Sequence, residues 1–289
     1  MSGVKPYHAI CHELFKMDEV EFSGNTDFFT IGTLKHSLNF NFNGQSYEYE
    51  DYHEGYRGYS IAGFISMAKF IDGNGKFSIL SYLDKYRNYN DDGTPMSIVD
   101  SNIGTEVTAS NINSIRVCTP THILVQLGAN GGGTYEQYKE IIDTIKSELP
   151  DVKVALAIND PMGTIFPSKY EVKDKRYIKW EWLNMDDNSS HHDPNRHKLC
   201  FNVQRIYNEH FDNDEYKSKG VYVLPFFFSA KPTYFASRRA DNPESVVVED
   251  SGYNIMPSGW YSNIHSDVRA HANYAYQLYS WIKYTLAIQ

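Results

Sequence analysis

The sequence lacks several features that would assign it at once to a class of protein. Its cysteines (Cys11, Cys118 and Cys200) are odd in number and widely spaced, so they predict neither a disulfide framework nor a zinc motif. The longest apolar runs, such as residues 221–228, are far too short to cross a bilayer. Because no basic stretch leads into an apolar one at the N-terminus, we predict no signal peptide and no membrane partner.

The sequence also has no concentration of positive charge. It contains 27 basic and 36 acidic residues, for a net charge of -9, and the basic residues form no block. A nucleic-acid-binding surface needs such a block, so we expect no nucleic-acid partner. Tyrosine, in contrast, is frequent at 23 residues, which is typical of surfaces that face sugars or proteins.

No convincing metal site is found in the sequence, and we expect neither a metal nor an organic cofactor. Residues 189–197 gather His191, His192, Asp193 and His197, but without the fixed spacing of zinc ligands, so a solvated loop is the preferred interpretation. Residues 90–95 contain two aspartates in a pattern typical of a turn, and the remaining ligand positions of a calcium loop are missing.

Segments with helical and with strand periodicity alternate along the chain, which predicts the α/β class with a mainly parallel sheet and helices on both faces. The helices are expected over residues 5–17, 61–71, 134–149, 198–211 and 267–287, and the strands over 27–33, 46–53, 123–128, 151–158 and 220–228. Thr134 and Gln137 form a capping-box pattern, after which Tyr138, Ile141, Ile142 and Ile145 share one face. With no internal repeat or linker, residues 1–289 are predicted to form one domain.

Long segments without clear periodicity follow some of these strands, at residues 72–120, 159–197 and 229–262. In an open α/β sheet, ligands bind at the carboxyl ends of the strands, so these segments are the expected walls of a site. The strand in "THILVQLGANGGG" (residues 121–133) ends at this edge in a Gly-x-Asn turn that contains Asn130.

Asn130, the glycine pair Gly55 and Gly58, and His265 are the candidate site residues. Asn130 and a backbone N–H of the glycine pair would donate hydrogen bonds to the oxyanion of a tetrahedral intermediate. His265, just before the C-terminal helix, would be the general base. Each has an ordinary structural alternative: a tight turn for Asn130, a helix-entry glycine for Gly58, and a surface or helix-start histidine for His265.

Taken in order, these motifs make the chain resemble an SGNH (GDSL-type) hydrolase over residues 5–285, especially the branch found in carbohydrate esterases and phage-associated esterase domains. "ILVQLGANGG" resembles the third family block, with Gly128 shaping the turn before Asn130. "EGYRGYS" resembles the second block, with its oxyanion glycine at Gly58, and "HSDVRAHANYAYQLYSWI" resembles the fifth, with Ala270 where glycine is usual. The resemblance implies a flavodoxin-like three-layer α/β/α sandwich.

The chain departs from the family at the nucleophile. No Gly-Asp-Ser is present, and "MSGVKPYHAI" resembles the segment that follows it, so the family's first strand is expected to be absent. The strands at 27–33 and 46–53 would then lack a common neighbour. The alternatives are a fragment, a strand supplied by another chain, or a rearranged fold. Ser2 lies outside the motif, whereas Ser60 and Ser66 are expected to be structural.

The chain also departs from the family at the acid. Ser262 stands where the family has an aspartate before its histidine, and Glu249 or Asp250 would have to replace it. Two functions therefore stay open. The first is a serine esterase that removes acyl groups from a carbohydrate. The second is an inactive SGNH-like module that binds a glycan or belongs to a virion or cell-surface assembly. We expect the chain on its own to be inactive rather than active.

Overall fold

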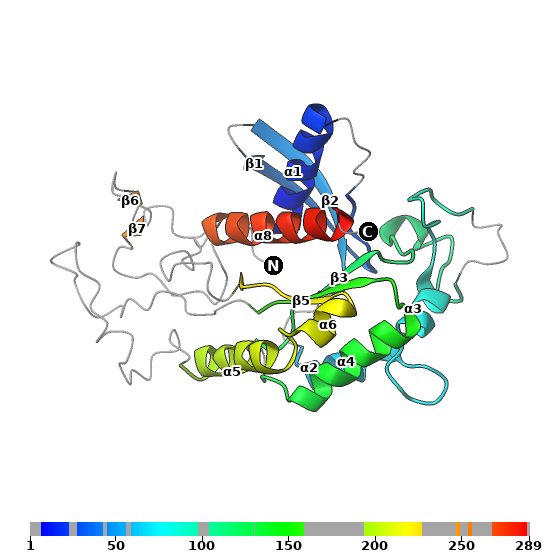
Figure 1. Cartoon of the computed structure of the whole chain (residues 1–289). Helices are drawn as coiled ribbons and strands as arrows, with labels where there is room; N and C mark the ends of the chain where they lie inside the picture. Colours follow the sequence, from blue (N-terminus) through cyan, green and yellow to red (C-terminus); the bar gives the residue numbers. More distant parts are fainter. Residues whose placement is uncertain are drawn as a thin grey trace.

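The fold is known from a computed structural model, which describes residues 7–22, 28–42, 45–55, 59–97, 104–129, 131–158, 194–226, 247–248, 254–255 and 268–287. Within these residues the protein belongs to the α/β class, as the sequence predicts. A parallel sheet lies at the centre, and helices cover both of its faces (Figure 1). The prediction of a single domain stays a prediction.

The central sheet contains three strands in the order β3 (His122–Val125), β4 (Lys153–Leu156) and β5 (Val221–Val223). All neighbours are parallel: Ile123 pairs with Val154, and Val154 pairs with Val221. These strands were predicted from continuous apolar runs, which are typical of strands buried on both faces. The strands are confirmed, although each is shorter than its apolar run.

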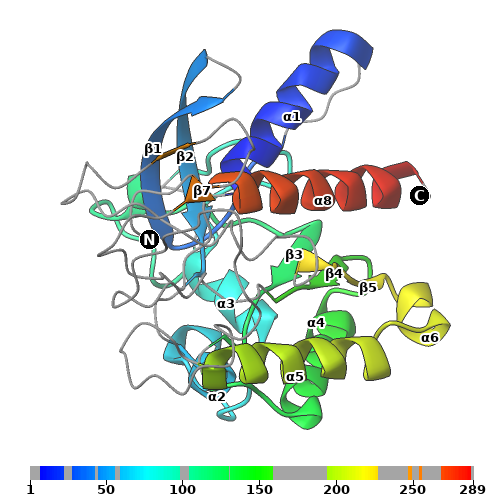
Figure 2. The same cartoon turned by 90° about the vertical axis from the view of Figure 1, so that its left-hand side faces the viewer.

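Alternation along β4 shows how the sheet is buried on both faces. Val154 and Leu156 belong to a core shared with α4 (Tyr135–Glu148) and α5 (Pro194–His210). Ala155 belongs to a second core, shared with α1 (Tyr7–Phe22) and α8 (Val268–Ala287). Successive side chains of a strand point to opposite faces, so the same strand contributes to both cores. The views in Figures 1 and 2 agree that α1 and α8 lie on one side of the sheet and α4 and α5 on the other.

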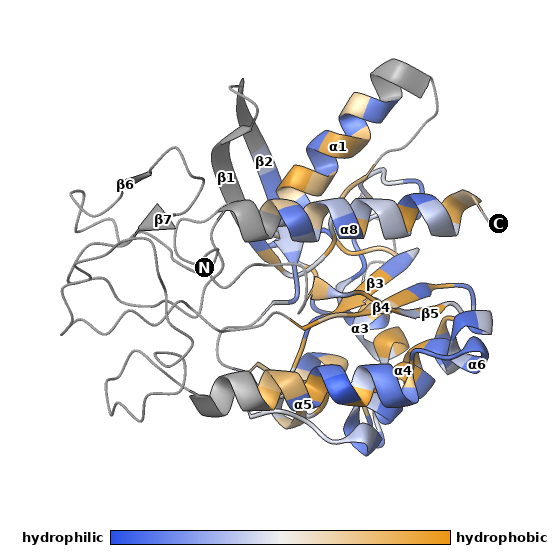
Figure 3. Cartoon of the chain, turned by 60° about the vertical axis from the view of Figure 1, so that its left-hand side comes forward, coloured by the Kyte–Doolittle hydropathy of each residue, from blue (hydrophilic) through white to orange (hydrophobic). Residues whose placement is uncertain are grey.

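The helix α4 forms as its sequence predicts. The Thr134 hydroxyl accepts from the Gln137 N–H, and the Gln137 side chain accepts from the Thr134 N–H, so the capping box is present. The expected stripe is buried in the first core, and its members are Tyr138, Ile141, Ile142 and Ile145. Mostly polar residues occupy the rest of the helix, and α5 and α8 likewise alternate between hydrophobic and hydrophilic residues (Figure 3).

The opposite core is closed by the pairing of α1 with α8. Tyr274, Leu278 and Trp281 of α8 recur at helical spacing and are buried in this core. Polar contacts also join the two helices. Near the C-terminal end of α8, Lys283 donates to Asp18 of α1 at 2.7 Å, and the Tyr279 hydroxyl contacts the same carboxylate. Helices from the two ends of the chain are thereby joined on one face of the sheet.

A separate antiparallel hairpin replaces the expected arrangement of the first two strands. β1 (Leu34–Phe42) pairs directly with β2 (Gln45–His53), with Phe42 opposite Gln45. The prediction of a strand at 27–33 is wrong: its described part makes only an isolated bridge, between Gly32 and Arg116. The expectation that strands at 27–33 and 46–53 lack a common neighbour is wrong as well, because 27–33 forms no strand in its described part and β2 pairs with β1 in a two-stranded sheet.

Two helices differ from their predictions. The helix expected over 61–71 is divided into α2 (Ile61–Ile65) and the 3-10 turn η1 (Ala68–Phe70). The sequence analysis missed α3 (Ile79–Tyr86), which is capped by the Ser78 hydroxyl and buries Ile79, Tyr82 and Leu83. The remaining elements are short: η2 (Ile112–Ser114), α6 (Asp214–Ser218), β6 (Val247–Val248) and β7 (Asn254–Ile255).

Candidate functional site

The chain leaves β3 through a turn of glycines at the carboxyl edge of the parallel sheet. Gly128 has φ 109°, and its carbonyl accepts from the Gly132 N–H at 3.0 Å, which closes the turn. Gly131 and Gly132 also have positive φ values, of 83° and 67°. L-residues with side chains rarely adopt such values, so the glycines of this motif are required by the backbone conformation.

Two buried tyrosines support the start of this turn. The hydroxyls of Tyr138 and Tyr207 both donate to the carbonyl of Leu127, at 3.2 and 3.4 Å. Burial raises the pKa of both phenols, so they remain protonated donors. A Cβ atom on Gly128 would overlap the Tyr138 hydroxyl and lie 2.9 Å from Cγ2 of Val203. Glycine at 128 is therefore needed for packing as well as for conformation.

The segment that begins α2 (Ile61–Ile65) lies beside this turn. A Cβ atom on Gly131 would lie 3.4 Å from Cβ of Ser60, so the two segments are in contact at these residues. Ser60 caps α2, and its hydroxyl accepts from the Gly63 N–H at 3.1 Å. This confirms that Ser60 is structural, as expected. Ser66 is also structural, because its hydroxyl donates to the Ala62 carbonyl at 2.9 Å.

Glu54, the residue after β2, is held by contacts from several segments. One carboxylate oxygen accepts from the Thr33 N–H and from the Tyr82 hydroxyl, both at 2.6 Å. The other oxygen accepts from the Lys69 ammonium at 3.2 Å. Contacts from three different segments thus hold the end of β2 in place.

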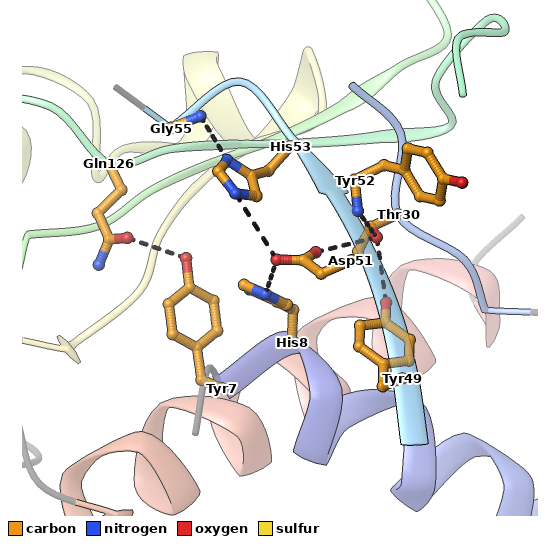
Figure 4. Close-up of polar contacts among 9 residues, drawn as sticks. All are labelled: Tyr7, His8, Thr30, Tyr49, Asp51, Tyr52, His53, Gly55 and Gln126. Carbon is orange, nitrogen blue, oxygen red and sulfur yellow. Dashed lines mark hydrogen bonds and ion pairs between the residues drawn. The ribbon is translucent and has the colours of Figure 1, made fainter. Parts of the chain in front are cut away.

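A cluster of titratable side chains from α1 and β2 lies close to this edge (Figure 4). Asp51 has no exposed surface, and its Oδ2 atom is in ion-pair contact with His8 Nε2 and lies 3.9 Å from His53 Nε2. Its Oδ1 atom accepts from the Thr30 hydroxyl at 3.1 Å. Tyr49 and the two histidines pack around this carboxylate, so α1 and β2 meet across it.

Asp51 is ionised in this environment. Burial raises the pKa of its carboxyl group, but the contact with His8 and the charges of His8 and His53 lower it by more, with a smaller contribution from Thr30. The net pKa is below the usual value for aspartate. A buried carboxylate is costly unless it is paired and hydrogen-bonded, so the His8 contact and the Thr30 hydroxyl are needed to keep it there.

A hydrogen bond connects this cluster to the sheet. The Tyr7 hydroxyl donates to Oε1 of Gln126 at 2.9 Å, and Gln126 follows directly after β3. The first turn of α1 is therefore held at the carboxyl end of β3, just before the Gly128 turn. This places His8 at the edge where ligands of α/β sheets bind.

The residues predicted from the motifs lie outside the described residues. These are Gly58, Asn130 and His265, together with Ser2, His191, His192, Asp193, Glu249, Asp250 and Ser262. Their roles stay predictions. The expected loop at 189–197 is partly wrong, because residues 194–197 belong to α5. The turn expected at 90–95 is confirmed, since Oδ1 of Asp92 accepts from the Thr94 N–H at 2.9 Å.

The sequence analysis missed the cluster around Asp51, although one signal for it was present. Tyr49, Asp51 and His53 alternate along β2 and therefore share one face of the strand. A carboxylate between aromatic residues on a buried face is unusual and often functional. The partner His8 could not have been found in this way, because it comes from a different element.

Within the described residues, no group of histidine, cysteine and acidic side chains is arranged to hold a metal ion. None of the helices that the structure describes combines the length and apolar character needed to span a bilayer. In comparisons with known proteins, the chain matches no family model, no curated protein and no solved structure.

Proposed function

We propose that this protein is an SGNH-type serine-esterase-like domain that hydrolyses acyl esters on a carbohydrate, with a flavodoxin-like three-layer α/β/α fold. The contact between Ser60 and Gly131 carries the proposal. It brings together the two segments that supply the oxyanion donors in this family. Both segments lie at the carboxyl edge of a parallel sheet, where such sites occur in α/β folds.

In the proposed reaction, the acyl carbonyl binds between the second block and the Gly128 turn. The N–H of Gly58 and the side-chain amide of Asn130 donate to the oxygen as negative charge develops on it. His265 takes the proton of the attacking serine hydroxyl and returns it to the departing sugar hydroxyl. The rigid support of the turn by Tyr138 and Tyr207 favours this role, since oxyanion donors must be held in place before the reaction.

The experiment combines turnover with covalent labelling. The purified chain is assayed on acetylated oligosaccharides by release of acetate, and its intact mass is measured after treatment with a fluorophosphonate, which labels activated serines. Acetate release together with a single adduct would support the esterase, and loss of the adduct in His265→Ala would assign the base to His265. We expect Asn130→Ala to lower kcat by about 10²–10³-fold, the usual effect of losing one oxyanion donor. Asn74→Ala, which alters an exposed asparagine in another turn, is the matched control.

The second function is an SGNH-like module without catalysis, which binds a glycan or belongs to a virion or cell-surface assembly. Two sequence observations favour it: no Gly-Asp-Ser is present, and Ser262 stands where the family has its acid. A folded chain that releases no acetate and forms no adduct, yet retains acetylated oligosaccharides on a column, would establish this function and refute the esterase.

A further inference from the structure

The cluster around Asp51 contains two histidines that differ in the use of their ring nitrogens. His53 is engaged on both sides. Its Nδ1 atom accepts from the Gly55 N–H at 2.9 Å, so the proton of a neutral ring is on Nε2, the atom that faces Asp51. With one nitrogen accepting and the other directed at the carboxylate, His53 has no lone pair left to accept a proton from a ligand.

His8 is engaged on one side only. Its Nε2 atom contacts the Asp51 carboxylate, which places the proton of a neutral ring on that nitrogen. Within the described part of the chain, its Nδ1 atom has no hydrogen-bond partner. The side chain is 13% exposed, so part of the imidazole ring is open to the surface. An imidazole with one N–H held by a buried carboxylate and the other nitrogen free is the arrangement of a general base.

The surroundings hold this pair in one geometry. Thr30 donates to the second oxygen of Asp51 at 3.1 Å and accepts from the Tyr52 N–H at 3.0 Å, which fixes the carboxylate. The rings of Tyr7 and Tyr49 pack on His8 from α1 and β2, with centroids 5.3 and 6.3 Å away. The hydrogen bond from Tyr7 to Gln126 then fixes the base at the carboxyl end of β3 (Figure 4).

We propose that His8, in place of His265, is the catalytic general base at this edge of the sheet and that Asp51 is its positioning residue. The proposal rests on the proposed esterase function and deepens it. The family's histidine block lacks its aspartate here, because Ser262 occupies that position. The buried pair of His8 and Asp51 supplies the carboxylate-supported imidazole that the C-terminal block is missing, from a different part of the chain.

In the proposed step, His8 carries one proton from the attacking hydroxyl group to the departing sugar oxygen. An attacking hydroxyl group loses its proton to Nδ1 of His8 as its oxygen forms a bond to the acyl carbon. Asp51 stays ionised and stabilises the resulting imidazolium through Nε2–H. When the bond from the acyl carbon to the sugar oxygen breaks, the proton on Nδ1 passes to that oxygen, and the sugar leaves as an alcohol. With water as the attacking group, the products are a carboxylic acid and the free hydroxyl.

The first test needs no turnover. Diethyl pyrocarbonate acylates the unprotonated nitrogen of accessible histidines, and peptide mapping by mass spectrometry follows each site separately. We expect His8 to react and His53, whose nitrogens are both engaged, to stay protected. In Asp51→Asn the amide donates to Nε2 and forces the proton onto Nδ1, so the reaction at His8 slows by about tenfold or more. Nitrogen-15 NMR of the His8 imidazole measures directly whether the proton has moved from Nε2 to Nδ1 in Asp51→Asn.

The second test measures catalysis by the whole chain. His8→Gln is expected to lower kcat for acetate release by about 10²–10⁴-fold with KM nearly unchanged, the effect of removing a general base. Asp51→Asn should lower kcat in the same way. His12→Gln is the matched control, since His12 lies one turn further along α1 and contacts Glu13 at 3.1 Å instead.

The possible results distinguish a failure of the proposed role of His8 from a failure of the esterase function on which it rests. An active chain in which His8→Gln turns over at the wild-type rate overturns the role of His8 and leaves the esterase intact. Protection of His8 from diethyl pyrocarbonate, or reactivity that Asp51→Asn does not change, overturns the pair itself. A chain with no turnover refutes the esterase, and the catalytic role of His8 is refuted with it, even if the labelling shows the pair to be formed.

Discussion

Replacement of Gly128 by alanine tests whether the turn after β3 is as constrained as its geometry indicates. A residue with a side chain at φ 109° is strained by about 1–3 kcal/mol. The new Cβ atom would also overlap the Tyr138 hydroxyl, which must move and lose its hydrogen bond to Leu127, at about 1 kcal/mol. We therefore expect Gly128→Ala to lower the free energy of unfolding by about 2–4 kcal/mol.

Variants at two other glycines distinguish the strain of a positive φ from the overlap of the new Cβ atom with its neighbours. Gly75 has φ 77°, but a Cβ atom there would meet nothing within 4 Å, so Gly75→Ala should show the conformational strain alone, at about 1 kcal/mol. Gly73 has neither a positive φ nor a neighbour within 4 Å, so Gly73→Ala should change stability by less than about 0.5 kcal/mol. The three variants thus form a graded series.

The measurement is urea unfolding followed by far-ultraviolet circular dichroism, with linear extrapolation to water and comparison of the slopes. An order of Gly128, then Gly75, then Gly73, from most to least destabilised, supports the reasoning. If Gly128→Ala is no more destabilised than Gly75→Ala, then the Tyr138 hydroxyl does not constrain this turn, and the rigid oxyanion support that we propose loses its basis.

Two further predictions concern buried polar groups. Burial lowers the pKa of His122 to about 4, with a contribution from Lys153, whereas an unfolded histidine titrates near 6.5. The unfolded state then binds a proton first as the pH falls, so between pH 6.5 and about 4 wild-type stability should fall by up to about 3 kcal/mol more than that of His122→Gln in urea unfolding. Asn88→Ala should cost about 3 kcal/mol at pH 7, because the Asn88 amide donates to the carbonyls of Ile112 and Ile115 and accepts from the Val117 N–H. A loss below about 1 kcal/mol would mean that water replaces these contacts.

The elements that the sequence predicted well are those whose signals lie within a few residues. The capping box of α4 requires only Thr134 and Gln137, and its buried stripe follows from helical spacing. The strands β3 and β4 follow from apolar runs. The α3 helix was missed although its signals were also local: Ser78 as a cap, followed by Ile79, Tyr82 and Leu83 on one face.

The hairpin was mispredicted because the strand propensity of a segment does not show which other segment it pairs with. The run at 27–33 is as apolar as a strand, but Thr30 hydrogen-bonds to Asp51 through its side chain instead of joining a ladder. A stronger signal lay further along, where Asn43 and Gly44 stand between the paired ends of β1 and β2. This dipeptide is typical of two-residue hairpin loops, and it correctly predicts the direct pairing of the two strands.

For the site, the sequence supplied the Gly-x-Asn motif and the requirement for glycine at 128, since both depend on backbone conformation within one turn. The contact between Ser60 and Gly131, and the pairing of His8 with Asp51, were decided only by the tertiary structure. A side chain's neighbours across the fold depend on how separate elements pack, and periodicity carries no information about that. Asp51 is an example. The sequence shows only an acidic residue on a strand, and the packing of α1 against β2 is what buries its carboxylate and brings His8 into contact with it.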